Sequence, residues 1–246
     1  MKVTKGVILA GGTGSRLRPL TRAHNKHMLP VADELMISYP VKTMADAGIT
    51  DIMVVLGGMH CEVAVTHLGD GSDYGVNIVY SFQKEPKGIS DALRRAKAFV
   101  NTDPSLVILG DNIFEDSFKD KIKAHPDNVA GIFLKSVDNL SDYGVARVKL
   151  GTVEHIVEKP KKQECNDVTD FAVTGAYLYP ADVFDAIETL KPSGRGELEV
   201  TDLNVFYLKQ KRLQAAFLQK RWFDCGASIQ QYQQVNDSLI QDRLKI

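Results

Sequence analysis

The segment of residues 5–20, KGVILAGGTGSRLRPL, most constrains the fold of this chain. It opens with a short apolar run, residues 7–9, and a run of this kind that stops at glycines is typical of a buried parallel strand. The run is followed by three glycines, a serine and an arginine: Gly11, Gly12, Gly14, Ser15 and Arg16. Glycines permit positive φ, and amides that point into such a turn bind anions. The segment therefore predicts a phosphate site at the carboxyl end of a first strand, where the guanidinium adds a charge suited to phosphate.

Two well-known phosphate-binding loops do not fit this segment. A P-loop requires Gly-Lys-Ser/Thr after its spacer, and no such tripeptide follows the glycines. A dinucleotide-binding loop requires a third glycine, and Leu17 occupies that position. From these residues alone, two interpretations stay open: a phosphate site of another type, or a glycine-rich turn that binds no ligand.

Charge and cysteine spacing argue against several classes of protein. The 246 residues carry a formal net charge of −1, so no general basic field attracts nucleic acid. Cys61, Cys165 and Cys225 have no paired spacing, which argues against a disulfide framework and against a zinc site. No apolar run reaches the length of a membrane span, and the N-terminus lacks the apolar region of a signal peptide. We therefore expect a cytoplasmic protein that binds neither nucleic acid nor membranes.

Strand-like and helix-like stretches alternate through the first half of the chain. Strands are expected over 7–9, 51–56, 76–80 and 106–109, and helices over 35–47, 60–68 and 88–100. This alternation predicts a mostly parallel sheet with helices on both faces. Ligands of such sheets bind beyond the carboxyl ends of the strands. The glycine loop, Gln83 and Asp111 all follow strands, so we expect them to share one rim.

Strands dominate the pattern from residue 129 onward. They are expected over 129–134, 144–148, 153–157, 172–179 and 213–218, with helices over 183–190, 198–209 and 227–244. No linker composition separates this half from the first. We therefore predict one domain, 1–246, made of two halves, 1–128 and 129–246.

Two acids stand where a carboxylate could hold a metal. Asp111 follows a buried strand, and Asp224 stands in Trp222-Phe-Asp-Cys-Gly226. Each could equally cap a helix or a turn, because Asp favours both positions. If both reach one Mg²⁺, the arrangement is chemically reasonable, since Mg²⁺ usually takes one or two carboxylates plus substrate phosphates.

Three further side chains are singled out: Lys26, Lys159 and Gln83. Lys26 is either a solvated charge or a phosphate ligand beside Arg16. Lys159, in Glu158-Lys159-Pro160, is by itself part of a surface charge pair before a proline turn. The amide of Gln83 can give and accept one hydrogen bond each, as the edge of a pyrimidine requires.

The segments 9–21, LAGGTGSRLRPLT, and 25–31, NKHMLPV, resemble the signature of the sugar-1-phosphate nucleotidyltransferases. Within that family they are most similar to the glucose-1-phosphate thymidylyltransferases. Later matches follow in order at DYGV (142–145), EKP (158–160), FAVTGAY (171–177) and PSGRGELEVTD (192–202). His27 replaces a common glutamine. The chain stops at Ile246, whereas longer family members carry a C-terminal segment tied to feedback control and assembly, so a short form is expected.

The resemblance implies a three-layer α/β/α nucleotide-diphospho-sugar transferase fold, Rossmann-like, with a mixed, mostly parallel central sheet. It implies that residues 1–128 bind the nucleotide and residues 129–246 the sugar. Catalytic roles are implied for Arg16, Lys26 and Lys159, and Mg²⁺ ligation for Asp111 and Asp224. Nucleotide contacts are implied at Leu9, Gly11, Gly12, Gly14, Ser15, His27, Gln83 and Gly88. Sugar contacts are implied at Tyr143, Gly144, Glu158, Val173 and Gly175.

The reaction implied is transfer of a thymidylyl group from dTTP to glucose 1-phosphate, giving dTDP-glucose, as in dTDP-rhamnose biosynthesis, and pyrophosphate. Family members are usually homo-oligomers, so a tetramer or dimer is expected. Three alternatives stay open. The nucleotide could be UTP, because uracil and thymine share the edge that Gln83 would contact. The chain could be a non-catalytic nucleotide-sugar sensor, although a sensor does not need both acids. A Rossmann oxidoreductase is disfavoured by the missing third glycine.

Overall fold

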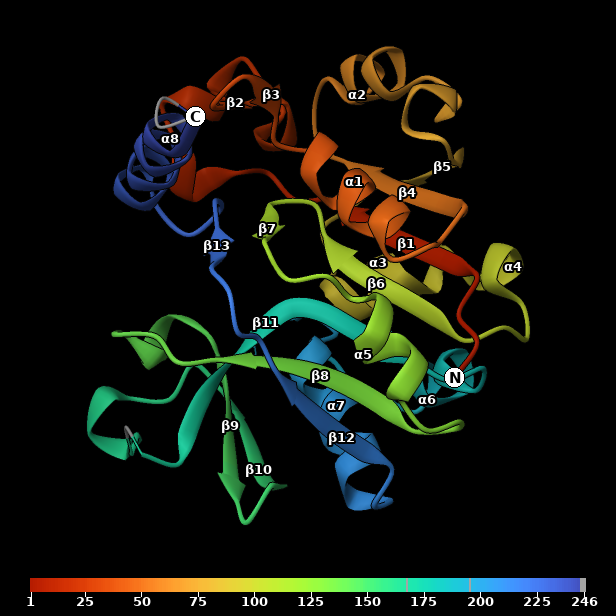
Figure 1. The fold of residues 1–246 in the computed structure, drawn as a ribbon, viewed down its shortest axis with the longest axis vertical. Helices are drawn as coiled ribbons and strands as arrows, with labels where there is room; N and C mark the ends of the chain where they lie inside the picture. The colour runs from red at the N-terminus through yellow and green to blue at the C-terminus, as the bar shows by residue number, and fades with distance from the viewer. Residues whose placement is uncertain (167, 195, 244–246) are drawn as a thin grey trace.

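The structure is a computed structural model that describes residues 1–166, 168–194 and 196–243. Its centre is a nine-stranded mixed sheet, in which seven strands run in the order β10-β9-β11-β6-β1-β4-β5 (Figure 1). The other two, β8 and β12, extend from β11, which pairs with β8. The mixed sheet expected from the sequence is therefore confirmed.

The first half of the chain forms the parallel part of the sheet. Its strands are β1 (Lys5–Ala10), β4 (Asp51–Gly57), β5 (Asn77–Gln83) and β6 (Ser105–Leu109). Helices connect them, as parallel pairing requires: α1 (Ser38–Asp46), α2 (Cys61–Leu68), α3 (Ile89–Arg94) and α4 (Lys97–Val100). The single helix expected over 88–100 is two pieces, because the backbone at Ala96 (φ −88°, ψ 0°) leaves the helical region.

The second half is mainly antiparallel. Its strands are β8 (Ala130–Lys135), β9 (Gly144–Lys149), β10 (Thr152–Glu158), β11 (Asp170–Tyr179) and β12 (Leu213–Phe217), with helices α6 (Val183–Glu188) and α7 (Val200–Lys209). The long strand β11 pairs with β9 near its start and with β6 near its end. One continuous sheet therefore runs through both halves.

Alternation along β1 explains the three layers. Val7 and Leu9 pack into one apolar cluster with α3, α6 and α7, whereas Ile8 and Ala10 pack into another with α1 and α2. Successive side chains of a strand point to opposite faces, so a strand that is apolar at every position is covered on both sides. Figure 1 shows helices on both faces, which confirms the three-layer prediction.

Several elements were not predicted from the sequence. They are β2 (Pro30–Val31), β3 (Glu34–Leu35), β7 (Asn112–Phe114), β13 (Trp222–Asp224), α5 (Lys119–Ala124) and short 3-10 turns at 15–17, 20–22, 26–28, 72–74, 140–142 and 162–164. Because residues 34–35 belong to a hairpin, the helix expected from 35 begins at Ser38. The expected last helix is α8 (Ile229–Arg243), and residue 244 lies outside the described part. Among the described residues, none of the helices combines the length and apolar character that a membrane crossing requires.

Candidate active site

The glycine loop follows β1 and has a backbone conformation that glycine adopts most easily. Gly12 and Gly14 have φ of 98° and 62°, in the left-handed region. The Thr21 hydroxyl donates a hydrogen bond of 2.6 Å to the Gly14 carbonyl and closes the loop. Arg16 is exposed beside it, close enough for its charge to act on the carboxyl of Asp224. The loop therefore has the open amides and the nearby cation that an anion site needs.

A second glycine pair, which was not singled out from the sequence, packs against this loop. A Cβ atom on Gly57 would lie 3.1 Å from Cα of Gly11, and one on Gly58 would lie 2.9 Å from the Gly12 carbonyl oxygen. The Asn25 amide donates to the Gly57 carbonyl at 3.1 Å. The sequence does contain a signal, because Gly57-Gly58 stands at the end of the buried strand β4.

The two acids meet because β7 and β13 pair, with Asp224 opposite Asn112. The Cys225 amide donates to the Asp111 carbonyl at 2.9 Å. A side chain at Gly226 would overlap the Asp111 carboxylate, so only glycine fits there. Lys26 also reaches this point, since its Nζ lies 2.5 Å from Oδ2 of Asp111. The structure thus brings Asp111, Asp224 and Lys26 together, as the sequence predicts.

The charges at this point are not balanced. Burial tends to raise the pKa of Asp111, but Lys26, His27 and hydrogen bonds from Lys26 and Asn112 hold it well below its usual value. Burial, and then the charge of Asp111, raise the pKa of Asp224 to about 6. Lys26 therefore pairs directly with one of the two carboxylates, and Asp224, which is half-buried, feels Lys26 and Arg16 only as weaker, opposing charges. A bound cation would therefore stabilise the ionised form of Asp224.

This donor set fits Mg²⁺. Both candidate ligands are carboxylates, the oxygen donors that Mg²⁺ prefers. Among the described residues, no group of three or more His, Cys, Asp or Glu side chains could hold a metal alone. That agrees with a site in which Asp111 and Asp224 supply two ligands and phosphates and water supply the rest.

His27 is buried under the rim rather than exposed in it. Its ring is 1% exposed, and a Cβ atom on Gly110 would lie 2.9 Å from its Cδ2. Burial, and then the charge of Lys26, lower the pKa of His27 to about 3, so the ring is neutral. Its Nδ1 lies 2.9 Å from Oδ1 of Asn25.

Asn112, which the sequence does not single out, connects the two sides of the site through hydrogen bonds. Its Oδ1 accepts hydrogen bonds from Trp222 Nε1 at 2.7 Å and from the Gly175 amide at 3.1 Å. Its Nδ2 donates to Asp111 Oδ1 at 3.1 Å. The ring of Trp222 packs on Tyr143 with 5.1 Å between centroids. Two predicted sugar contacts, Tyr143 and Gly175, are therefore linked to a predicted metal ligand.

The Glu-Lys-Pro segment follows β10. Glu158 accepts a 2.6 Å hydrogen bond from the hydroxyl of Thr201 on α7. Lys159 has φ of 45°, unusual for a residue with a side chain, and its amide donates to the Tyr143 carbonyl at 3.0 Å. Its backbone is thereby fixed while its side chain stays 39% exposed.

The side chain of Gln83 ends over the glycine loop. A Cβ atom on Gly11 would lie 2.9 Å from its Oε1. Its Nε2 donates to Asp91 Oδ2 at 2.8 Å and to the Gly88 carbonyl at 3.3 Å. Both acceptors of Nε2 therefore lie within the protein, and the contact with a base that is expected of this amide stays a prediction.

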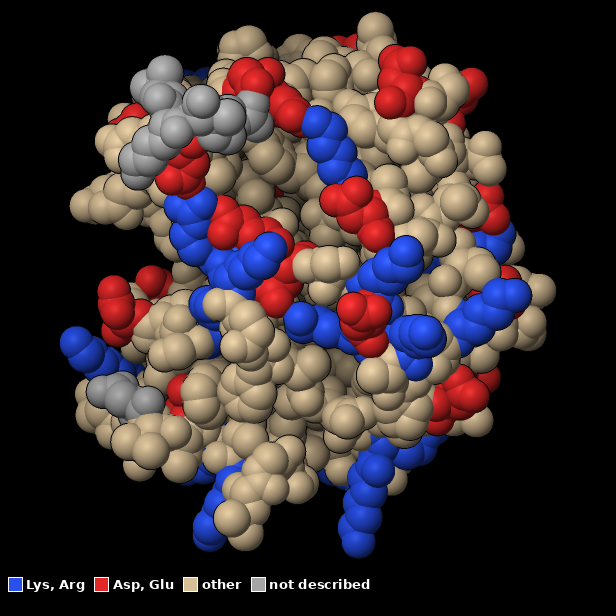
Figure 2. Space-filling view, viewed as in Figure 1, with Lys and Arg blue, Asp and Glu red and all other residues tan. Residues whose placement is uncertain are grey.

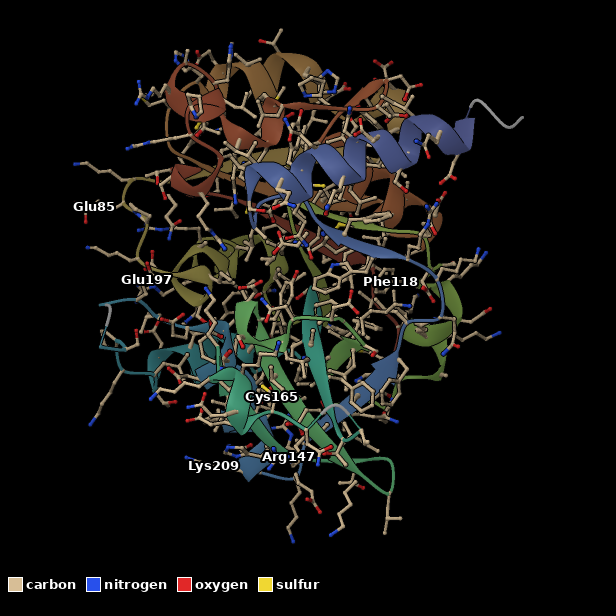
Figure 3. The ribbon with its side chains drawn as sticks, turned by 90° about the vertical axis from the view of Figure 1, so that its left-hand side faces the viewer. Glu85, Phe118, Arg147, Cys165, Glu197 and Lys209 are labelled. Atoms are coloured by element: carbon tan, nitrogen blue, oxygen red, sulfur yellow. The ribbon has the colours of Figure 1, made fainter. Side chains whose placement is uncertain are left out.

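The segment 192–202 lies against the loop that carries Gly88. The Leu198 amide donates to the Lys87 carbonyl at 2.9 Å, and the Ser90 amide donates to the Leu198 carbonyl at 3.1 Å. Figure 3 shows Glu85 and Glu197, one from each segment, on the same side of the molecule. This pairing and the hydrogen bond of Thr201 place residues 198–201 of the PSGRGELEVTD segment, whose role the sequence left open, between the Gly88 loop and Glu158, whereas Arg195 lies outside the described residues.

The remaining predicted residues lie on the same strands and loops. Leu9 is buried near the end of β1, and its carbonyl accepts a hydrogen bond from the Gly110 amide at 2.9 Å. Ser15 is exposed after the glycines, Gly144 begins β9, and Val173 lies in β11. Figure 2 shows the outline of the molecule indented on one side.

Comparison with known families and proteins gives consistent matches. The family model described as nucleotidyl transferase matches residues 5–242. The Haloferax volcanii low-salt glycan biosynthesis nucleotidyltransferase Agl11 is 45% identical over 201 residues, which is 80% of this chain and 55% of that protein. This chain therefore spans about half the length of that relative. A glucose-1-phosphate thymidylyltransferase of Xanthomonas campestris pv. campestris (strain B100) is 40% identical over 92% of this chain and 77% of its own length.

Solved structures agree with these matches. A crystal structure of a candidate glucose-1-phosphate thymidylyltransferase from Bacillus anthracis, in complex with a sucrose, has a TM-score of 0.89 and 41% identity over 97% of this chain and 95% of that chain. A UDP-glucose pyrophosphorylase structure has a TM-score of 0.84 at 24% identity over 98% of this chain and 100% of that chain. The second likeness supports the fold alone.

Proposed function

The chain belongs to the nucleotidyltransferase family, and from that premise we propose that it transfers a thymidylyl group from dTTP to glucose 1-phosphate. The products are dTDP-glucose and pyrophosphate. The observation that carries the proposal is the meeting of Lys26, Asp111 and Asp224 beside the glycine loop. The relatives named glucose-1-phosphate thymidylyltransferase support the choice of substrates.

The nucleotide occupies the first half of the chain in this proposal. The amides of Gly11, Gly12 and Gly14 and the hydroxyl of Ser15 receive the triphosphate. Arg16 and Lys26 offset charge on the α-phosphate and on the leaving pyrophosphate. Opposite charges about 4 Å apart attract by roughly 4 kcal/mol at an effective dielectric of 20, so two cations offset much of the repulsion between two phosphorylated substrates.

The sugar phosphate occupies the second half. Lys159 holds its phosphate in line with the α-phosphorus, and Glu158 and the Gly144 amide bind sugar hydroxyls, with Tyr143 and Val173 beside them. The attacking group is already an anion, so no general base is needed. Catalysis is then positioning together with charge neutralisation, as in phosphoryl transfer generally.

Asp111 and Asp224 would hold Mg²⁺, which supplies further positive charge to the phosphates when bound. The family resemblance also supports a cytoplasmic homo-oligomer that serves dTDP-rhamnose biosynthesis.

Pyrophosphate release tests the proposal directly. The protein is incubated with Mg²⁺ and glucose 1-phosphate, and dTTP, UTP, ATP, CTP and GTP are compared in parallel. Strong release with dTTP is the expected result. Release mainly with UTP keeps the mechanism and replaces the nucleotide. Silence with every nucleotide, repeated with other sugar 1-phosphates, points to a nucleotide-sugar sensor instead.

A further inference from the structure

The orientation of the Gln83 amide is fixed by its neighbours. Its Nε2 lies 2.8 Å from Oδ2 of Asp91 and 3.3 Å from the carbonyl oxygen of Gly88. Both neighbours are oxygen atoms that accept hydrogen bonds. If the amide were turned over, its Oε1 would face two acceptors and no hydrogen. Because a glutamine amide has only two N–H donors, both are used inside the protein.

Asp91 can act only as an acceptor in this arrangement. The residue is 1% exposed, and its Oδ1 lies 2.5 Å from a guanidinium nitrogen of Arg94. Burial tends to raise the pKa of Asp91, but hydrogen bonds from Gln83 and Arg94 hold it below its usual value. The carboxylate is therefore ionised at neutral pH and has no proton to donate.

The Gly88 carbonyl is fixed as well. It accepts the Ala92 amide of α3 at 3.2 Å. The backbone of Gly88 has φ of 102°, and a side chain there would overlap the backbone of Leu198. Neither partner of the Gln83 Nε2 can therefore move aside easily.

The free end of the amide points toward the candidate nucleotide site. Oε1 of Gln83 would lie 2.9 Å from a Cβ atom on Gly11, so it stands over the glycine loop. A base placed there meets an acceptor and receives no hydrogen bond from this side chain. Thymine and uracil offer a ring N–H at position 3, whereas cytosine has a lone pair on that atom.

We propose that Asp91 is a positioning residue that holds Gln83 as a pure acceptor and so makes the site select pyrimidines with an N3–H. This inference rests on the proposed function and adds the physical basis of its base choice. Guanine also carries a ring N–H, so the contact discriminates among pyrimidines and leaves purine exclusion to other parts of the site. Two acceptors facing each other in a buried contact are costly, and sites of this kind discriminate by about 10⁴-fold.

The test compares kcat/KM for dTTP and dCTP in the wild type, Asp91→Asn and Arg94→Gln. In Asp91→Asn the new amide can donate to Oε1, so a turned Gln83, with its N–H groups toward the base, is opposed by only one of its two present acceptors, the Gly88 carbonyl. We expect the dTTP/dCTP ratio to fall at least about 10-fold in Asp91→Asn. In Arg94→Gln, which leaves the carboxylate in place, the ratio should stay within about twofold. An Asp91→Asn enzyme that is active with dTTP at an unchanged ratio overturns the inference while the proposed function stands.

A second measurement needs no variant and decides the question if Asp91→Asn does not fold. N3-methyl-dTTP lacks the ring N–H, and we expect its kcat/KM in the wild type to be at least about 100-fold below that of dTTP. The matched control is dUTP, which keeps the N–H and lacks only the thymine methyl. Equal use of N3-methyl-dTTP and dTTP overturns the inference. If no nucleotide releases pyrophosphate, the proposed function fails, and equal calorimetric affinity for dTTP and dCTP would then also overturn this inference.

Discussion

Nζ of Lys26 lies 2.5 Å from Oδ2 of Asp111, although 85 residues separate the two in the sequence. Both side chains are largely buried, at 14% and 9% exposure. Asp224 adds a second carboxylate whose pKa is raised to about 6 by burial and by the charge of Asp111. At Asp224, burial and the charge of Asp111 therefore outweigh the opposing charges of Lys26 and Arg16. This imbalance favours the binding of a cation beside the two carboxylates.

The first prediction concerns Asp111. Asp111→Asn keeps the shape of the side chain and removes the charge that would hold Mg²⁺ and pair with Lys26. We expect kcat for pyrophosphate release to fall at least about 100-fold, because charge stabilisation is the main catalytic term in this proposal. The fold should survive, since the substitution also removes the repulsion of Asp224. The control is Asp46→Asn on the exposed side of α1. Near-normal turnover of Asp111→Asn at saturating Mg²⁺ contradicts the metal assignment.

The second prediction concerns Lys159. Its backbone is fixed by the hydrogen bond to Tyr143, and its ammonium, 4.0 Å from Oε1 of Glu158, is 39% exposed and so accessible to a phosphate. Lys159→Met should lower kcat/KM for glucose 1-phosphate by about 100-fold and leave the KM for dTTP within about threefold. The matched control is Lys162→Met, an exposed lysine three residues further on. Equal losses for both substrates would place Lys159 outside the sugar phosphate site.

Local patterns were sufficient to predict the parallel half of the sheet. The apolar run of β1 is followed by glycines, and the three parallel strands after it, β4, β5 and β6, alternate with helices in the expected order. The rim was also predictable, because the carboxyl ends of parallel strands meet at one edge. The glycine loop, Gln83 and Asp111 are expected at one rim for that reason.

The parts that were missed depend on contacts between distant residues. Asn112 looks like a turn residue, and only the pairing of β7 with β13 shows that it joins Trp222 and Gly175. In the sequence, Asp91 looks like an ordinary acid in the first turn of a helix. Its contact with Gln83 forms because the chain turns at Gly88, between the two residues. No periodic pattern and no motif in the sequence indicates either contact.

The third prediction concerns Thr201, whose hydroxyl donates to Glu158 at 2.6 Å. Thr201→Val keeps the volume and removes the donor. A charge-assisted hydrogen bond contributes about 1.5–3 kcal/mol, so we expect the KM for glucose 1-phosphate to rise about 10-fold or more. The KM for dTTP should not change. Steady-state kinetics with each substrate varied in turn measures both, with the exposed Thr152→Val as control. A rise confined to dTTP would contradict the placement of Glu158 at the sugar.

The fourth prediction concerns the acid stability of the fold. Burial and the charge of Lys26 lower the pKa of His27 to about 3, while in the unfolded chain a histidine titrates near about 6.5. As pH falls below about 6.5, the unfolded state binds a proton that the folded state does not. The free energy of unfolding therefore falls through this window by up to about 1.4 kcal/mol per pH unit from this residue.

His27→Gln removes the titrating ring while it keeps an amide that can hydrogen-bond. Between pH 7 and pH 5, the free energy of unfolding of the wild type should fall by about 2 kcal/mol more than that of His27→Gln, because only the wild type has a buried ring that resists protonation. Urea unfolding at pH 7, 6 and 5, in the presence of EDTA, measures the difference. His24→Gln, at an exposed position three residues earlier, should follow the wild type. Parallel curves for the wild type and His27→Gln would show that His27 is protonated in the folded protein.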